Sequence, residues 1–304
     1  MYNASAYIEQ ALSSISDQDY ENLEIIIVDD HSTDLSHEIV LKASIVDQRI
    51  HIYQCLTKGA AAARNQAYKQ SKGEYIIFFD ADDWIPKNFI TTQLKSLIDK
   101  CDVVVAKWGR FYDNINNVII DKNQIQQDLT FMEWVTKYWI DASHMTCPGR
   151  VLIPKNLVEK ADGWDESLSL NDDFTFYTKV FSLTNIIRFN KDSLFYYRSG
   201  NNGLSSRRGK KEYQSFYDSL TQGISTAKFV LPECKQNNIC YANLLQNFIY
   251  EVYPFEPGLL KKARQQILTL GGTTFKFPAG GMTEMMVNIL GWKLTKKIKN
   301  LFKV

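Results

Sequence analysis

Two apolar stretches of this chain each run directly into a group of aspartates. Leu23–Val28 and Glu74–Phe79 are mainly apolar on both faces, as expected of strands that are covered by helices on both sides. In open α/β sheets, ligands bind beyond the carboxyl ends of the strands. We therefore expect the acids that follow the two stretches to meet in one crevice: Asp29, Asp30, Asp80, Asp82 and Asp83.

Helical and strand-like patterns alternate around these two stretches. The further expected elements up to residue 107 are helices over 7–15, 39–46, 60–70 and 88–98, and strands over 50–53 and 102–107. Such alternation implies parallel strands joined by helical crossovers, hence an α/β fold with a mostly parallel central sheet flanked by helices. Residues 110–120 indicate a hairpin with its turn near Asn116, and the chain after Ser206–Lys211 is mainly helical.

Composition narrows the class of protein. A chain of 304 residues with 45% hydrophobic side chains can bury a large core. Its net charge of +1 gives no reason to expect a nucleic-acid partner. The five cysteines are scattered without a spacing that suits zinc, and neither a signal peptide nor a run of about 18 apolar residues is visible. We therefore expect a cytoplasmic protein.

The acids in the segment Asp80–Asp83 have two interpretations. Three carboxylates so close together repel one another unless a cation lies between them, and Mn²⁺ or Mg²⁺ with a diphosphate is the natural occupant. Alternatively, the same acids cap a helix that starts at Trp84, with Pro86 in its first turn. The residues alone leave both interpretations open.

A set of short motifs, taken together, resembles the family 2 inverting glycosyltransferases. They are Tyr2-Asn3, Val28-Asp29-Asp30-His31-Ser32-Thr33-Asp34, Gly59 with Ala63-Arg64-Asn65, and Gly73-Glu74-Tyr75-Ile76-Ile77-Phe78-Phe79-Asp80-Ala81-Asp82-Asp83. The resemblance covers roughly residues 1–205 and implies a GT-A fold that binds a UDP-sugar. It divides the chain into a nucleotide-binding half (1–107), an acceptor half (108–205) and a helical C-terminal region (206–304).

The resemblance also implies roles for residues of the first half. Asp30 matches the aspartate that binds the uracil ring, and Asp29 supports its loop. Asp80 matches the acid near the ribose and the metal, Asp82 the acid that ligates the metal, and Asp83 shapes the turn. Arg64 starts a helix below the nucleotide, where it would pair with Asp30 or face the phosphates; clamping the aspartates is an equal alternative. At His31 the family usually has a small residue, so a positive φ would strain this position.

In the second half, the resemblance assigns the catalytic base to Asp173. The segment Asn171-Asp172-Asp173 follows Gly163-Trp164-Asp165-Glu166, and Asp172 stands where the family usually has Glu. An inverting transfer needs one base and no protein nucleophile. The alternative is structural: Asn171 suits a helix N-cap, and acids in a first turn are favoured by the helix dipole.

Other residues of the second half have paired interpretations. Arg198 would neutralise the leaving group, next to a closing loop formed by Ser199–Gly203 and Leu204–Ser206, or this loop is an ordinary surface segment. The aromatic side chains of Tyr138, Trp139 and Trp164 form either a stacking surface for a sugar ring or part of the core.

The two ends of the chain carry separate expectations. The chain opens at Met1-Tyr2-Asn3, without the first strand usual in this family, so we hypothesise a truncated sequence. At the other end, one helical face carries Val287, Leu290, Leu294, Ile298 and Leu301 beside Trp292 and five lysines. Such a basic amphipathic helix docks on anionic membranes, here the inner face of the cell membrane, or packs on the catalytic domain.

The resemblance implies a metal-dependent glycosyltransferase. It would transfer a hexosyl or N-acetylhexosaminyl group from a UDP-sugar to a hydroxyl of a lipid-linked or polysaccharide acceptor. The products would be bacterial surface glycans such as O-antigen, capsule or exopolysaccharide. The alternatives are a nucleotide-sugar binding module without turnover and a sugar nucleotidyltransferase, although the Gly-rich basic first loop of the latter class is not visible.

Overall fold

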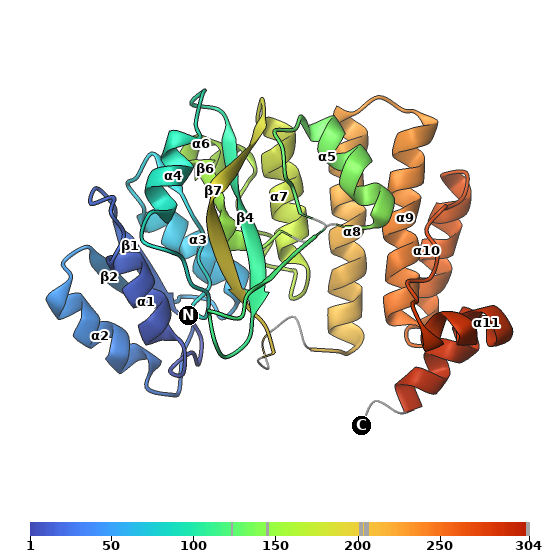
Figure 1. Cartoon of the computed structure of the whole chain (residues 1–304), viewed down its shortest axis with the longest axis horizontal. Helices are drawn as coiled ribbons and strands as arrows, with labels where there is room; N and C mark the ends of the chain where they lie inside the picture. Colours follow the sequence, from blue (N-terminus) through green and yellow to red (C-terminus); the bar gives the residue numbers. More distant parts are fainter. Residues whose placement is uncertain (123, 144–145, 201–202, 204–206, 302–304) are drawn as a thin grey trace.

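The first three helices pack around a small parallel sheet at one end of the molecule. The computed structural model describes residues 1–122, 124–143, 146–200, 203 and 207–301. The elements of this end are α1 (Ile8–Ser16), β1 (Ile25–Asp29), α2 (Ser36–Val46), β2 (Ile50–Gln54) and α3 (Ala60–Gln70). Strands β1 and β2 pair in parallel, with Ile25 opposite Ile50 (Figure 1). The expected helices and the strand over 50–53 are confirmed here.

A second, mixed sheet lies beside the first. Its strands are β3 (Tyr75–Ile76), β4 (Val103–Phe111), β5 (Ile119–Ile120), β6 (Val151–Pro154) and β7 (Ile187–Arg198), in the order β3-β6-β4-β5 with β7 also paired to β4. Among the described residues of this sheet, β4 and β7 pair in parallel, whereas β6 runs antiparallel to both of its neighbours and β5 runs antiparallel to β4. The α/β class is confirmed, whereas the sheet is less parallel than the alternation predicts. The hairpin over 110–120 is present as β4 and β5.

The two sheets share no ladder among the described residues. Met1 lies against β1, where its amino group donates to the carbonyl of Val28 (2.9 Å) and its carbonyl accepts from the amide of Asp30 (2.8 Å). The predicted strand over 74–79 is wrong in length, since only Tyr75 and Ile76 pair with β6. The helix expected over 88–98 is α4 (Phe89–Lys95).

The rest of the described chain is mainly helical. It contains α5 (Phe131–Tyr138), two 3₁₀ turns (Trp139–Asp141 and Pro148–Arg150), α6 (Lys155–Lys160), α7 (Asp172–Leu183), α8 (Lys210–Val230), α9 (Lys235–Val252) and α10 (Pro257–Thr269). One continuous hydrophobic core joins β4, β6, α7, α8 and α9. The helical region therefore packs directly on the mixed sheet.

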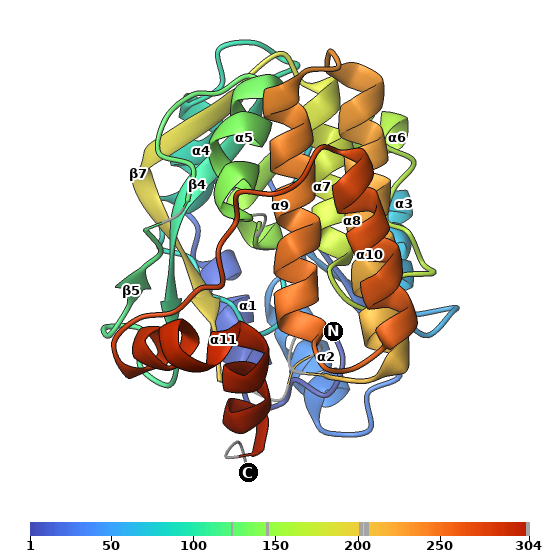
Figure 2. The same ribbon diagram turned by 90° about the vertical axis from the view of Figure 1, so that its right-hand side faces the viewer.

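The last helix, α11 (Met282–Leu301), breaks in its middle. Gly291 has φ 73° and ψ 156°, so the two segments point in different directions (Figure 2). The prediction of a single continuous amphipathic helix is wrong, because glycine permits a left-handed backbone that ends the regular turn. No helix among the described residues combines the length and apolar character that crossing a membrane requires.

Candidate active site

The loop Asp80–Asp83 follows β3 as a tight turn. The amide of Asp83 donates to the carbonyl of Asp80 (3.2 Å), and α4 begins only at Phe89, with Asn88 as its N-cap. These acids therefore do not cap a helix at Trp84, which removes that interpretation. The Asp83 carboxylate is buried, and its Oδ1 accepts from the Arg198 amide (2.9 Å). Burial, and then the negative charges of Asp82 and Asp80, raise the pKa of Asp83 well above its usual range.

Arg64 joins the two halves of the site. From α3, its Nη2 donates to Asp80 (2.8 Å) and its Nη1 donates to Asp172 (3.0 Å). The guanidinium also lies over the ring of Trp164, with Cζ 4.4 Å from the ring centroid. Among the described residues Arg64 forms no ion pair with Asp30, so of its expected contacts the structure shows the clamp on the aspartates. The two carboxylates raise the pKa of Arg64 against the opposing effect of burial.

Asp173 lies in the first turn of α7, beside this clamp. Its Oδ1 accepts from the amide of Phe174 (2.9 Å). Burial, followed by the negative charge of Asp172, raises the pKa of Asp173 to about 7, although Arg64 acts in the opposite direction. Asn171 occupies the N-cap position with φ 62°, but its amide donates to Ser219 of α8 (3.0 Å) instead of capping the helix. The pKa of the Asp173 carboxyl group therefore lies close to neutral pH.

Asp29 and Asp30 lie at the carboxyl end of β1 and are both buried. Asp29 fastens its own loop, because Oδ1 accepts from the hydroxyl of Ser32 (2.6 Å) and Oδ2 lies 3.4 Å from Nδ1 of His37. Asp30 accepts from the amide of Gly59 (2.9 Å), the residue just before α3. The loop thus connects the end of β1 to the helix that carries Arg64.

His31 in the same loop has φ 63°. This is the positive φ that we expected to strain a residue other than glycine at this position. A histidine tolerates this region less well than glycine does.

Arg198, at the end of β7, uses its donors on the loops around it. Nε donates to the carbonyl of Asp82 (2.8 Å), Nη1 to the carbonyl of Tyr112 (2.9 Å), and Nη2 to the side chain of Gln10. The guanidinium also lies 4.4 Å from the ring centroid of Phe111. It forms no ion pair within the described ranges, so it shapes the main chain at Asp82. Most of the predicted closing loop, residues 201–202 and 204–206, lies outside the described residues.

Asn65 and Trp164 also belong to this arrangement, through a contact that the sequence did not predict. Asn65 of α3 accepts from the amide of Trp164 (2.8 Å) and donates to its carbonyl (2.9 Å). Trp164 is 2% exposed and stacks on Phe176 of α7, with ring centroids 4.3 Å apart. The preceding Gly163 has φ +62°, and a Cβ there would lie 2.7 Å from Asn65 Oδ1. Asn65 thus fastens the turn that carries Trp164 against α7.

The expected sugar-stacking surface is not formed by the tryptophans. Trp139 and Trp164 belong to the core, and half-buried Tyr138 donates its hydroxyl to the carbonyl of Gln124 (3.1 Å). These three aromatic residues therefore follow the core interpretation.

The carboxylates fit a divalent cation that is shared with a substrate. Across the described ranges, no three His, Cys, Asp or Glu side chains are grouped as a complete metal cage. Mg²⁺ and similar ions commonly use only one or two carboxylates together with substrate phosphates. Asp82 and Asp80 can supply these, and the buried Asp83 Oδ2 accepts no hydrogen bond from the described residues. These oxygens could therefore hold a divalent ion together with a diphosphate.

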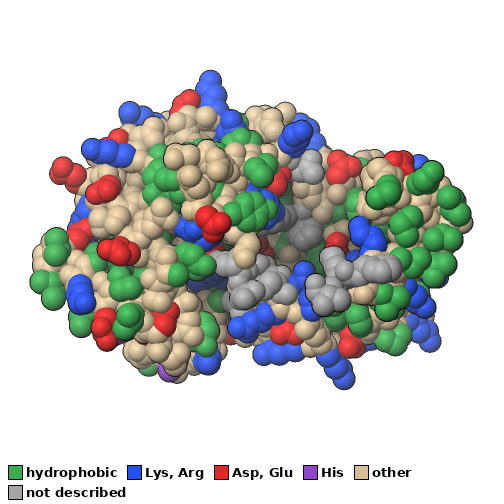
Figure 3. Space-filling model, turned by 60° about the horizontal axis from the view of Figure 1, so that its bottom comes forward, with side chains coloured by type: hydrophobic (Ala, Val, Ile, Leu, Met, Phe, Trp, Pro, Cys, Tyr) green, Lys and Arg blue, Asp and Glu red, His purple; other side chains and the backbone are tan. Residues whose placement is uncertain are grey.

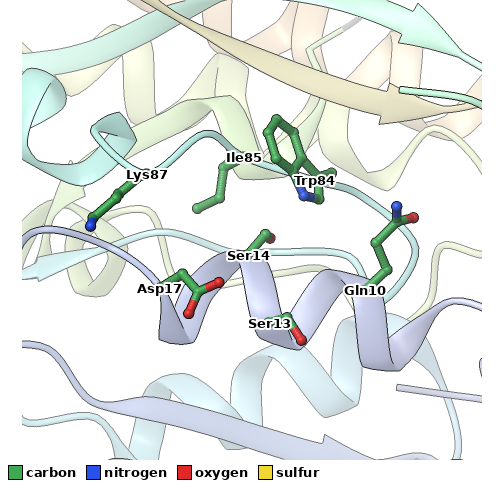
Figure 4. A pocket seen from close by; sticks show the side chains of 7 residues that line it. All are labelled: Gln10, Ser13, Ser14, Asp17, Trp84, Ile85 and Lys87. Carbon is green, nitrogen blue, oxygen red and sulfur yellow. The ribbon is translucent and has the colours of Figure 1, made fainter. Parts of the chain in front are cut away.

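A cavity of about 510 Å³ lies next to the carboxylates, between α1 and the loop after Asp83 (Figure 4). Its lining residues are Gln10, Ser13, Ser14, Asp17, Trp84, Ile85 and Lys87. None of the site aspartates lines it, so it adjoins the candidate site without containing it. Gln10 is shared, because it also accepts from Arg198.

Comparison with known proteins gives consistent matches. The sequence profile described as Glycosyl transferase family 2 matches residues 1–160. Glycosyltransferase GlyG of Streptococcus pneumoniae is 30% identical over 207 residues, 65% of this chain and 68% of that protein. The chain matches only 16% of the length of GlyA from the same organism, at 36% identity over 38% of this chain.

The name of a further relative states a specific activity. The E. coli protein named UDP-Glc:alpha-D-GlcNAc-diphosphoundecaprenol beta-1,3-glucosyltransferase WfaP is 44% identical over 114 residues, 36% of this chain and 43% of that protein.

Solved structures support the fold. S. aureus TarS 1–349 in complex with UDP-GlcNAc superposes with a TM-score of 0.72 at 19% identity, covering 100% of this chain and 89% of that one. The mannosyltransferase PcManGT of Pyrobaculum calidifontis, in complex with GDP-Man and Mn²⁺, gives a TM-score of 0.57 at 17% identity, with 99% and 85% covered. The GT-A fold is thereby confirmed.

Proposed function

Because this chain belongs to glycosyl transferase family 2, we propose that it transfers a sugar from a UDP-linked donor to an acceptor hydroxyl with inversion. The observation that carries the proposal is the bridge made by Arg64. This side chain brings the Asp80–Asp83 loop and the first turn of α7 together, beside a carboxyl group whose pKa is raised to about 7. A general base is most useful when its pKa lies near the working pH.

Asp173 acts as the base in this proposal. Its carboxylate takes the proton of the acceptor hydroxyl while that oxygen attacks the anomeric carbon from the face opposite the leaving group. The bond between the anomeric carbon and the diphosphate oxygen breaks, and UDP departs with the bonding electrons. No protein nucleophile takes part, since a single displacement inverts the anomeric centre.

The other site residues bind and orient the donor. Asp30, held by the Gly59 amide at the start of α3, is the proposed contact of the uracil ring, and Asp29 supports its loop. Asp82, with Asp80, would hold Mn²⁺ or Mg²⁺, which when bound supplies positive charge for the departing diphosphate. Arg198 supports this loop through the Asp82 carbonyl and places a positive charge beside it.

The proposed acceptor is a lipid-linked or polysaccharide glycan of the bacterial surface, such as O-antigen, capsule or exopolysaccharide. The names of the relatives support this class, since WfaP is named as a glucosyltransferase acting on GlcNAc-diphosphoundecaprenol and TuaG of Bacillus subtilis is named as a putative glycosyltransferase of teichuronic acid biosynthesis. The hexosyl or N-acetylhexosaminyl class of donor is part of the same proposal, and TarS was solved with UDP-GlcNAc.

The test compares binding with turnover in the full chain. We expect Asp173→Asn to lower transfer from UDP-sugars by about 10²–10⁴-fold, because the amide cannot accept the proton. The affinity for UDP with Mn²⁺, measured by calorimetry, should stay near that of the wild type. Asp30→Ala is the matched control and should weaken UDP binding.

Two results would contradict the proposal. Full activity of Asp173→Asn would remove Asp173 as the base. A wild-type chain that binds UDP-sugars but never turns them over, with any acceptor preparation, would instead be a binding module.

A further inference from the structure

The first segment of α11 exposes a row of large apolar side chains. Met282, Met285 and Ile289 are 84%, 64% and 73% exposed. Their spacing of three and four residues places them on one side of the helix. Single exposed apolar residues are ordinary, but a contiguous group of them on a soluble surface marks an interaction site.

The second segment of α11 is basic. Lys293, Lys297 and Lys299 are exposed, and Leu294 and Leu301 between and beyond them are 46% and 77% exposed. No acidic residue follows Glu284 in this helix. Within the described part of the chain, none of these three lysines forms an ion pair. The outer surface of α11 thus combines apolar side chains with an excess of positive charge.

An aromatic cluster fixes the inner side of α11. Trp292, the residue after the Gly291 break, packs edge-to-face on Tyr250 (4.9 Å between centroids) and Tyr253 (5.1 Å) of the α9 end and stacks on Phe277 (5.9 Å). Because Trp292 faces inward, it is not the interfacial anchor that its position in an amphipathic helix suggests. The apolar row on the first segment is left facing away from the protein.

The exposed surface of α11 lies on the same side of the molecule as the candidate active site. Strand β7, which ends at Arg198, runs toward the lower part of Figure 1, where α11 and the start of α8 also lie. Exposed Arg207, Lys210 and Lys211 add positive charge at the start of α8. Figure 3 looks onto this side and shows hydrophobic side chains gathered at its right-hand end, with Lys and Arg side chains along its lower edge.

We propose that this surface docks on an anionic lipid bilayer, with the candidate active site facing the membrane. The α11 surface is defined as the exposed residues of its two segments: Met282, Met285, Ile289, Lys293, Leu294, Lys297, Lys299 and Leu301. Its apolar residues would enter the headgroup boundary and its lysines would contact anionic headgroups, as interfacial helices do. The docking itself is independent of catalysis; the presentation of a lipid-linked acceptor to the candidate active site rests on the proposed function.

Charge favours a membrane over a second copy of this chain. A two-fold contact places the same patch against itself, so the lysines of one copy would meet those of the other. Like charges brought together in this way oppose association. An anionic bilayer satisfies both the apolar row and the lysines.

Co-sedimentation of the full chain with vesicles tests the proposal. We expect binding to vesicles of phosphatidylcholine and phosphatidylglycerol that weakens with salt, and little binding to phosphatidylcholine alone. Met285→Asn/Ile289→Asn and Lys297→Gln/Lys299→Gln should each weaken binding on the order of tenfold. The substituted residues are exposed, so the fold should be retained, which circular dichroism can verify.

Matched controls lie elsewhere on the surface. Phe229→Asn, at the far end of α8, removes a side chain that is 92% exposed, and Lys69→Gln/Lys72→Gln removes two exposed lysines, one in the last turn of α3 and one just after it. These controls should bind like the wild type. Asp173→Asn should also bind like the wild type, so failure of docking and failure of the proposed transfer are read separately.

Three results would overturn the proposal. They are no binding of the wild type to anionic vesicles, equal losses in the α11 and control variants, and unchanged vesicle binding when the α11 variants convert a dimer to a monomer in analytical ultracentrifugation. The last result would assign the surface to a second copy of the chain.

Discussion

Two arginines at the candidate active site hold the same group of acidic residues by different means. Arg64 forms ion pairs with the carboxylates of Asp80 (2.8 Å) and Asp172 (3.0 Å). Arg198 donates to the carbonyl oxygens of Asp82 (2.8 Å) and Tyr112 (2.9 Å) and to the side chain of Gln10. Arg64 is thus held mainly by charge, whereas Arg198 is held by the fit of three separate hydrogen bonds.

Because their partners differ, the positive charges of Arg64 and Arg198 act on different parts of the site. Arg64 has two carboxylate partners, and one of them, Asp172, lies 108 residues further along the chain. Its charge is largely balanced, so its main effect is to hold the Asp80 loop against α7. The charge of Arg198 lowers the pKa of buried Asp83 against the larger effect of burial, and its backbone amide binds the same carboxylate. Arg198 therefore stabilises the loop that would carry the metal.

Removing the charge of Arg64 should produce the largest effect. In Arg64→Met, two partly buried carboxylates lose their counter-charge, which should cost about 2–4 kcal/mol of unfolding free energy and most of the transfer activity. Urea denaturation measures the first effect and initial rates measure the second.

The double variant Arg64→Met/Asp172→Asn sharpens this prediction. It should regain part of the lost stability, because one unpaired carboxylate has been removed. Arg198→Met/Asp172→Asn should show no such recovery relative to Arg198→Met, since Asp172 is not a partner of Arg198. Equal recovery in both backgrounds would show that the two arginines do not differ in the way described.

Replacing each arginine by lysine should show whether its charge or the geometry of its hydrogen bonds matters more. The expected losses of unfolding free energy are smaller than for Arg64→Met. Arg64→Lys keeps a positive charge that can pair with either carboxylate, so we expect a loss of about 1 kcal/mol. Arg198→Lys cannot reach three acceptors in different directions and leaves partly buried acceptors unpaired, so we expect a loss of about 2 kcal/mol. Thermal denaturation of the two variants side by side measures the order, and the reverse order would contradict the comparison.

The sequence predicted the fold best where a local pattern was sufficient. The Ala-rich helix over 60–70 is α3 to the residue, because its propensity and spacing are local. The strand expected over 74–79 pairs over only two residues. Its partner β6 lies more than 70 residues further along the chain, so no local pattern could predict where the pairing ends. A lone glycine in a helical pattern did not reveal the break at Gly291, because glycine inside a helix costs only about 1 kcal/mol.

In the candidate site too, local motifs were predictable from the sequence, whereas contacts between distant residues were not. The aspartates were found because their motif is contiguous and follows strands. The contact of Asn65 with Trp164 spans 99 residues, so only the tertiary structure brings these residues together. The partners of Arg64 were likewise open in the sequence, where Asp30, the phosphates and the other aspartates were equal alternatives. The roles of Asp30, Asp82 and Asp173 in binding and catalysis stay predictions.

The pH dependence of the rate gives the smallest and most specific test of the comparison. With the pKa of Asp173 raised to about 7, the rate should rise with pH through this value as the carboxylate forms. Arg64 lowers this pKa, so Arg64→Met should move the rise to higher pH by roughly one unit. Arg198→Met should leave the midpoint unchanged, because Arg198 is not among the main influences on Asp173. Rate profiles of the three proteins measure these midpoints.

The pH dependence of the free energy of unfolding provides an independent check on the pKa of Asp173. A carboxyl whose pKa is raised by folding holds its proton more tightly in the folded than in the unfolded chain, so its contribution to stability is present below about pH 4 and is lost as pH rises through about 7. Asp173→Asn cannot ionise and escapes this loss. The variant should therefore gain stability relative to the wild type between pH 5 and pH 8, by roughly 1–3 kcal/mol. A constant difference between the two proteins across this range would mean that Asp173 titrates at its ordinary pKa, and the raised pKa would then not support its proposed role as the base.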